Sequence, residues 1–207
     1  MNKQVVRAAA LAAVVLVAGA SAQAALVKYR MTGVVTQGGE FDDGSRVVEG
    51  MPVTVSVTYD SKQTASEMQR NSDGSGNAVY DFAGPYHFKM RVGDHRVHVP
   101  QFRVRLFNDL NQPFGDEVDV EASNGAYIDG VLQPDGRYSV SLLSQPGNLG
   151  ALKSLRLPKH LQESSFDAFR VGYLAKDIDH PLVTFAVWSI KSTVCDAVPG
   201  TDDCAGQ

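Results

Sequence analysis

The chain has 207 residues, 43% of them hydrophobic, and its 19 basic and 23 acidic side chains give a formal net charge of −4. This acidic balance argues against non-specific nucleic-acid binding by the protein as a whole. The length suits one domain with a sizeable core.

The N-terminus has the pattern of a secretory signal peptide. Lys3 and Arg7 precede an uncharged apolar run, residues 8–20, which is followed by the small residues 21–24. A transmembrane anchor is the alternative, but the run is shorter than the roughly 18 residues that a spanning helix needs. We therefore expect residues 1–24 to be removed after Ala24 and the mature protein, with no membrane span, to be secreted or periplasmic.

Alternation of apolar and polar residues with a period of two indicates β-strands through most of the remaining chain. In residues 51–60, Val53, Val55, Val57 and Tyr59 share one face, as in a half-buried strand. The same pattern recurs in residues 26–35, 101–107, 116–122, 126–132, 137–143, 168–175 and 182–190.

Short turns separate these runs, as expected for strands that pair with their neighbours. Glycine-rich or Asp-Gly signals lie at 38–39, 42–44, 93–94, 124–125 and 134–136. We predict an all-β fold with little helix: a single antiparallel β-sandwich, jelly-roll-like, over residues 25–194.

Two segments do not fit the strand pattern. Residues 157–166 could form a short helix, although an irregular crossing loop is equally compatible with them. Residues 61–76 are polar, without periodicity, and are expected to form a long surface loop.

Residues 88–99 predict a hairpin that turns at Gly93-Asp94. One face would carry apolar side chains and the other Lys89, Arg91, Arg96 and His98, with Arg91 directly opposite Arg96. Like charges in that position are unfavourable unless they are solvated or share an anion.

The surrounding sequence strengthens this asymmetry of charge. Residues 86–106 carry a net charge of +4, from five basic and one acidic residue, whereas residues 109–135 contain seven acidic and no basic residues. In one interpretation the basic side chains form a solvated face that pairs with the acidic segment. In the other, Lys89, Arg91, Arg96, Arg103 and Arg105 bind an anionic polymer such as polysaccharide, lipopolysaccharide or extracellular DNA.

The order of several segments resembles a known family. These are "YRMTGVVTQ" (29–37), "VVEGMPVTVSVTYD" (47–60), "YHFKMRVGDHRVHV" (86–99), "RVRLFNDL" (103–110) and "GALKSLRLPKHLQESSFDAFRVGYL" (150–174). Together they resemble a secreted β-sandwich module of bacterial proteins that carry a PEP-CTERM sorting tail, over most of residues 27–194. The sorting tail itself does not match, since Gly200 in "AVPG" replaces the Glu of its motif. The resemblance implies a fold and a compartment, and no catalytic residues.

Motifs of common catalytic sites are absent from the chain. G-x-S-x-G, H-E-x-x-H, a P-loop and a dinucleotide fingerprint do not occur. We therefore expect a non-catalytic binding or matrix module. The alternative is a carbohydrate-active or other hydrolase, whose paired carboxylates would need a defined separation that one sequence does not reveal.

No cofactor is predicted apart from structural calcium, an ion that prefers six to eight oxygen ligands. Residues 108–121 offer Asp109, Asp116 and Asp119 as the preferred ligands, and residues 71–77 are a weaker candidate. Neither matches an EF-hand loop, and Asn, Asp and Gly also serve turns without a metal.

The two cysteines, Cys195 and Cys204, lie in the C-terminal tail, residues 195–207. In an oxidising compartment a disulfide between them is expected. It would close a short loop and stabilise chiefly the tail, by roughly 2–3 kcal/mol.

Overall fold

The computed structural model describes residues 26–40, 45–109, 115–122, 125–134, 136–148, 150–175 and 181–195. The signal peptide, its cleavage after Ala24 and the partner of Cys195 in the expected disulfide, Cys204, lie outside these ranges, so these predictions stay untested. Cys195 itself is buried at the end of the last strand. The elements are β1 (Leu26–Gln37), β2 (Gly39–Glu40), β3 (Arg46–Val47), β4 (Pro52–Asp60), β5 (Glu67–Arg70), β6 (Gly76–Phe82), β7 (His87–Val92), β8 (His95–Val99), β9 (Phe102–Asn108), β10 (Glu117–Ala122), β11 (Ala126–Ile128), β12 (Val131–Gln133), β13 (Arg137–Leu143), a 3-10 turn (Glu163–Ser165), β14 (Phe169–Ala175) and β15 (Pro181–Cys195).

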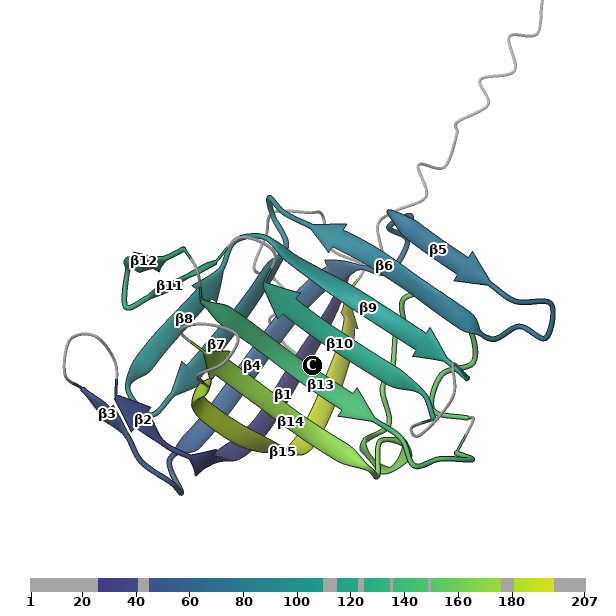
Figure 1. Cartoon of the computed structure of the whole chain (residues 1–207). Coiled ribbons are helices and arrows are strands. Elements are labelled where there is room, and N and C mark those ends of the chain that lie inside the picture. The colour runs from purple at the N-terminus through teal and green to yellow at the C-terminus, as the bar shows by residue number, and fades with distance from the viewer. Residues whose placement is uncertain are drawn as a thin grey trace, which may run out of the picture.

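Thirteen of the strands form one antiparallel sheet that curls into a half-barrel around the core (Figure 1). Their order is β12-β11-β8-β7-β4-β1-β15-β14-β13-β10-β9-β6-β5. The long strand β15 pairs with β1 on one side and β14 on the other, and so joins the two layers of the sandwich. The predicted all-β, antiparallel fold is confirmed. Within the described ranges, no helix is long and apolar enough to cross a membrane.

Alternation in the sequence decides which side chains enter the core. Val53, Val55, Val57 and Tyr59 of β4 are buried, as predicted. The hairpin of β7 and β8 turns at Gly93-Asp94 with the predicted register. β9 pairs with β10 and β6 rather than with β8, so the chain crosses at Pro100 and Gln101 from one layer of the sandwich to the other. We call β12-β11-β8-β7-β4-β1 the first layer and β14-β13-β10-β9-β6-β5 the second.

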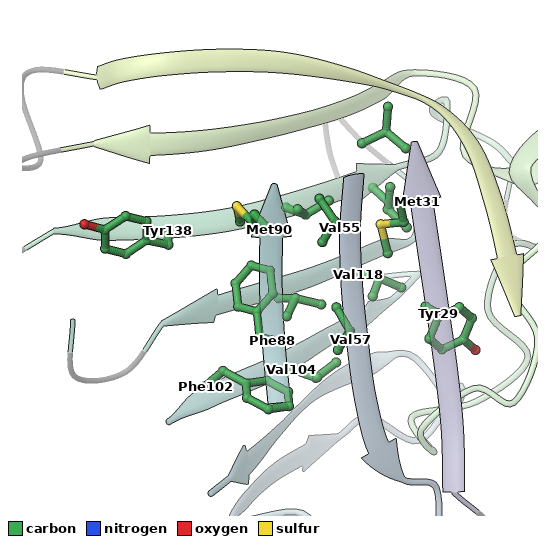
Figure 2. Packing of buried hydrophobic residues seen from close by; sticks show 14 of the residues in the cluster. Tyr29, Met31, Val55, Val57, Phe88, Met90, Phe102, Val104, Val118 and Tyr138 are labelled. Atoms are coloured by element: carbon green, nitrogen blue, oxygen red, sulfur yellow. The ribbon is translucent and has the colours of Figure 1, made fainter. Parts of the chain in front are cut away.

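Aromatic rings connect the layers through the interior. The ring of Phe82 lies 5.6 Å from that of Tyr59 and 5.1 Å from that of Phe102, measured between centroids, and Tyr59 lies 5.7 Å from Tyr29. Phe88 of β7 meets Phe102 of β9 across the core, 6.1 Å apart (Figure 2). Such buried rings contribute much of the apolar area that stabilises the fold.

Residues 150–168 pack against the core between the two layers. Of the two predicted alternatives for this segment, the irregular crossing loop is the one observed. Only Glu163–Ser165 makes a 3-10 turn. The hydroxyl groups of Tyr29 and Tyr59 both donate to the carbonyl oxygen of Pro158, at 2.8 and 2.6 Å. Buried in the core from this segment are Leu152, Leu155, Leu157, Leu161 and Phe166.

The sequence predicted a long surface loop for residues 61–76. The structure differs in part, because this segment contains the short strand β5. All four residues of β5 are exposed, and the strand is held by its backbone pairing with β6. A strand with no buried face has no alternation to reveal it.

Candidate functional site

The first layer of the sandwich has a basic outer face that extends beyond the predicted hairpin. Lys89 of β7 lies opposite His98 of β8 on one side and Ser56 of β4 on the other. Ser56 lies opposite Arg30 of β1, which in turn lies opposite Lys191 of β15. One row across five strands therefore carries three cations and a histidine, over about 19 Å at the usual strand spacing.

The neighbouring rows add cations and hydroxyl groups. We call this surface the basic face and define it by its cations: Lys28, Arg30, Lys89, Arg91, Arg96 and Lys191. Arg91 lies directly opposite Arg96, in the predicted register, and Thr54 and Thr32 continue their row on β4 and β1.

In the part of the chain that the structure describes, carboxylates compensate this face only at its margins. Asp60 ends β4, and Asp94 and Asp129 lie in turns. Arg91 lies 3.7 Å from Asp94, but both side chains are highly exposed, so the pair contributes little stability. Among the described residues, the other five cations of the basic face have no ion pair within 4 Å.

The local potential also acts on His98. Partial burial, followed by the charge of the neighbouring Lys89, lowers the pKa of His98 below its ordinary value. The imidazole is therefore neutral at pH 7 and adds a hydrogen-bonding group rather than another cation.

Arg103 and Arg105 do not belong to the basic face, which corrects the expected grouping of five basic residues. They lie on β9, whose alternate residues Phe102, Val104 and Leu106 are buried from the second layer. Since Phe102 meets Phe88 across the core, the residues that alternate with them point outward in opposite directions.

On the second layer these arginines pair with acidic groups. The Nε atom of Arg103 lies 3.3 Å from Asp81 Oδ1 and 3.8 Å from Glu121 Oε1, and Arg105 makes a close ion pair with Glu121. The interpretation in which basic side chains balance the acidic segment thus applies to Arg103 and Arg105.

The same outer face contains a polar groove of about 380 Å³. We call it the arginine groove, because Arg103, Arg105 and Arg137 line it together with Glu121 and Ser139. Arg137 is exposed on β13 and has no ion pair among the residues that the structure describes. The sequence did not indicate Arg137, because only the pairing of β10 with β13 brings it to this groove.

Asp109, Asp116 and Asp119, the expected calcium ligands, are only partly brought together. Asp116 is fully buried, and its two carboxylate oxygens accept hydrogen bonds from the backbone N–H groups of Asp109 and Leu152, at 2.9 and 2.7 Å. Burial, and then the nearby charge of Asp116, raises the pKa of Asp109. Asp119 instead lies on β10, opposite Arg105.

This arrangement gives Asp116 a structural role that needs no ion: its carboxylate joins the end of β9 to residues 150–168. No group of three or more His, Cys, Asp or Glu side chains in the described part of the chain is arranged to hold a metal.

Two carboxyl groups do interact closely on the outer face of β10. Burial, and then the charge of Asp119 and a hydrogen bond with it, raises the pKa of Glu117 to about 7, while Arg105 opposes the shift. Neither residue lines the arginine groove. The pair can hold a proton near neutral pH, but it is not placed in a described cleft.

No protein-family model, curated protein or solved structure matches this chain.

Proposed function

We propose that this chain is an exported, non-catalytic β-sandwich module that binds an anionic polysaccharide on its basic face. The observation that carries the proposal is the row His98–Lys89–Ser56–Arg30–Lys191, with cations on three strands and no carboxylate between them. An acidic protein that gathers several cations on one face creates a local positive potential despite its net charge.

The geometry of this face suits an extended polymer. Backbone pairing fixes the strands, so the cations form a regular array in which neighbouring strands along each row are about 4.8 Å apart. The hydroxyl groups of Ser56, Thr54 and Thr32 lie between the cations and can donate to sulfate, carboxylate or sugar oxygens.

Retention on an immobilised anionic polysaccharide tests the proposal. The mature protein is expected to bind a heparin column at low salt and to elute early as salt rises, because exposed charges are screened within about 10 Å at 0.1 M. The double substitution Arg30→Glu and Lys89→Glu should abolish retention. These side chains are exposed or project outward, so the free energy of unfolding should change little.

Arg70→Glu with Lys153→Glu is the matched control. It changes the net charge equally, but Arg70 lies on β5, at the far edge of the sheet, and Lys153 in the crossing segment. Equal loss of retention in the control would show an effect of net charge alone, and a parent protein that passes through the column would refute the proposal.

Export is tested separately by the intact mass of the secreted protein. We expect a chain that begins at Ala25 and has no alkylatable thiol, as the signal peptide and the Cys195–Cys204 disulfide require. A chain that retains residues 1–24, or one with two free thiols, would contradict this part of the proposal.

The alternative of a hydrolase has one observation in its favour, the carboxyl pair of Glu117 and Asp119. Glycosidases place their two carboxyl groups about 5–5.5 Å or 6.5–9.5 Å apart, with the sugar or water between them. Glu117 and Asp119 alternate on one strand, the charge of Asp119 helps to raise the pKa of Glu117, and neither residue lines the arginine groove. We therefore prefer the binding module.

A further inference from the structure

Trp188, the one tryptophan of the chain, is 62% exposed on the outer face of the sheet. It is the extra residue of a β-bulge, because Ser189 and Val187 pair with the successive residues Thr32 and Gly33 of β1. Bulges redirect a side chain and are common beside functional sites. The backbone of β15 therefore presents this large ring to solvent.

Two more aromatic side chains lie on the same face. Phe169 and Tyr173 of β14 are 55% and 37% exposed, and they lie on the outer side of the strand because they alternate with the buried Gly172 and Leu174. Val171 lies opposite Ala186, and the two strands are antiparallel. Phe169, two residues before Val171, therefore lies beside Trp188, two residues after Ala186. Phe169 and Trp188 line one open groove of about 370 Å³. Exposed aromatic side chains that cluster in this way are typical of interaction sites.

These rings continue into the arginine groove. Tyr173 lies directly opposite Ser139, which lines that groove, and Arg137 precedes Ser139 by two residues. Tyr173 and Arg137 are therefore diagonal neighbours on paired strands. Residues in this relation are roughly 7–8 Å apart, within reach of long side chains. From Phe169 to the row of Arg137 is about 20 Å at the usual rise of a strand.

We propose that Trp188, Phe169, Tyr173 and Arg137, which we call the aromatic track, form a second binding site for an acidic polysaccharide. Its sugar rings would stack on the aromatic side chains and its carboxylate groups would bind Arg137. The C–H groups on one face of a sugar ring carry partial positive charge and complement the negative face of an aromatic ring. The planar guanidinium group matches a carboxylate and can bind it through two hydrogen bonds.

Charge selects this ligand over a neutral polymer or a protein surface. Arg137 has no ion pair among the described residues, so a carboxylate on the ligand would complement it. On the neighbouring strand, Ser139 lies opposite Tyr173 and Ser141 lies opposite Val171. Their hydroxyl groups can bind sugar oxygens. The core of a protein–protein interface is more continuously apolar than this.

The inference shares its class of ligand with the proposed function but uses a different part of the outer surface. Phe169, Tyr173 and Arg137 lie on β14 and β13, whereas Trp188 lies on β15, three residues from Lys191 of the basic face. A protein with both sites would connect two polysaccharide chains, as a matrix component does. The aromatic track must therefore be tested with the basic face inactivated.

The test uses the Arg30→Glu, Lys89→Glu variant of the mature protein, titrated with alginate, a soluble polyuronate, while Trp188 fluorescence is recorded. Because Trp188 is the one tryptophan, its emission reports on this site. We expect a saturable emission shift with alginate and none with hydroxyethylcellulose, a neutral glucan.

Affinity electrophoresis in alginate gels then compares substitutions in the same background. Trp188→Ala and Arg137→Ala are each expected to weaken binding by about tenfold, on the scale of aromatic stacking measured by alanine substitution. Tyr127→Ala is the matched control, because Tyr127 is exposed on β11, beside His98 and near the outer edge of the first layer.

Three results would overturn the inference. One is the absence of an emission shift with alginate, and another is equal migration of the parent and the Trp188→Ala variant. The third is a parent that sediments as a dimer and a Trp188→Ala variant that sediments as a monomer, which would make the aromatic track an interface between copies. Since the background lacks the basic face, none of these results depends on the proposed function.

Discussion

Phe88 and Phe102 meet edge to face in the core, with ring planes inclined at 62°, although they belong to strands on opposite layers of the sandwich. Their contact determines where the basic side chains can lie. Arg91 alternates with Phe88 on β7, and Arg103 alternates with Phe102 on β9, so the two guanidinium groups point away from each other. Five basic residues that are close in sequence thus supply two surfaces with different chemistry.

Charge reversal is expected to have opposite effects on the two surfaces. Arg96→Glu should stabilise the protein by about 0.5 kcal/mol, because it converts the like-charged pair with Arg91 into an attractive one. Arg105→Glu should destabilise it by about 1 kcal/mol, because it leaves Glu121 facing another carboxylate. Denaturant melts of the two variants measure both changes, and two equal losses would contradict this division of the surfaces.

The sequence predicted the features that depend on pairing between neighbouring strands and missed those that depend on pairing between segments far apart in the chain. The hairpin of β7 and β8 has the predicted register, because its turn and its alternation lie within residues 88–99. Lys191 joins the basic face only through the pairing of β15 with β1, whose residues are far apart in the chain. Alternation identifies the outward side chains of a strand but does not order the strands, so Arg30 and Lys191 were missed and Arg103 and Arg105 were grouped with the wrong surface.

The buried carboxylate of Asp116 is expected to be essential for stability. Asp116→Asn should lower the free energy of unfolding by about 2–3 kcal/mol, because an amide nitrogen would then face one of two backbone N–H donors. Asp167→Asn is the control, since Asp167 is exposed and its Oδ1 atom alone accepts the N–H of Gln145. A loss in the Asp116 variant no greater than in this control would show that the buried hydrogen bonds contribute little.

Calcium is expected to leave the melting temperature unchanged. A ligand stabilises a protein only when it binds the native state more tightly than the unfolded state. Both oxygens of Asp116 already accept backbone N–H groups, and Asp119 lies on β10 opposite Arg105. Thermal melts with calcium and with EDTA make the comparison. A rise with calcium that Asp109→Asn removes would show that a site forms after all.

The bulge that exposes Trp188 should require glycine at position 33. A Cβ atom on Gly33 would lie 1.8 Å from the carbonyl oxygen of Ala186, which is far inside van der Waals contact. Gly33→Ala is therefore expected to cost about 3 kcal/mol, at the upper end of overpacking effects, and to shift the emission of Trp188. Gly150→Ala is the control, since nothing lies within 4 Å of its added Cβ. Unchanged stability and emission in the Gly33 variant would contradict the observed geometry of the bulge.

The raised pKa of Glu117 predicts a dependence of stability on pH. Its folded-state pKa of about 7 exceeds its ordinary value of 4.5, so the native state holds the proton more tightly than the unfolded state. The resulting stabilisation is fully present below about pH 4.5 and is lost as the pH rises through about 7. Glu117→Gln, which is neutral at every pH, should match the parent at about pH 5 and exceed it at about pH 8. The gain is roughly 1 kcal/mol, because the partial exposure of Glu117 reduces the full effect. Denaturant melts at both pH values measure it, with Glu67→Gln on exposed β5 as the control. A Glu117→Gln variant that is less stable than the parent at the higher pH would show that the Glu117 carboxylate is stabilised by Arg105 rather than destabilised by burial and Asp119.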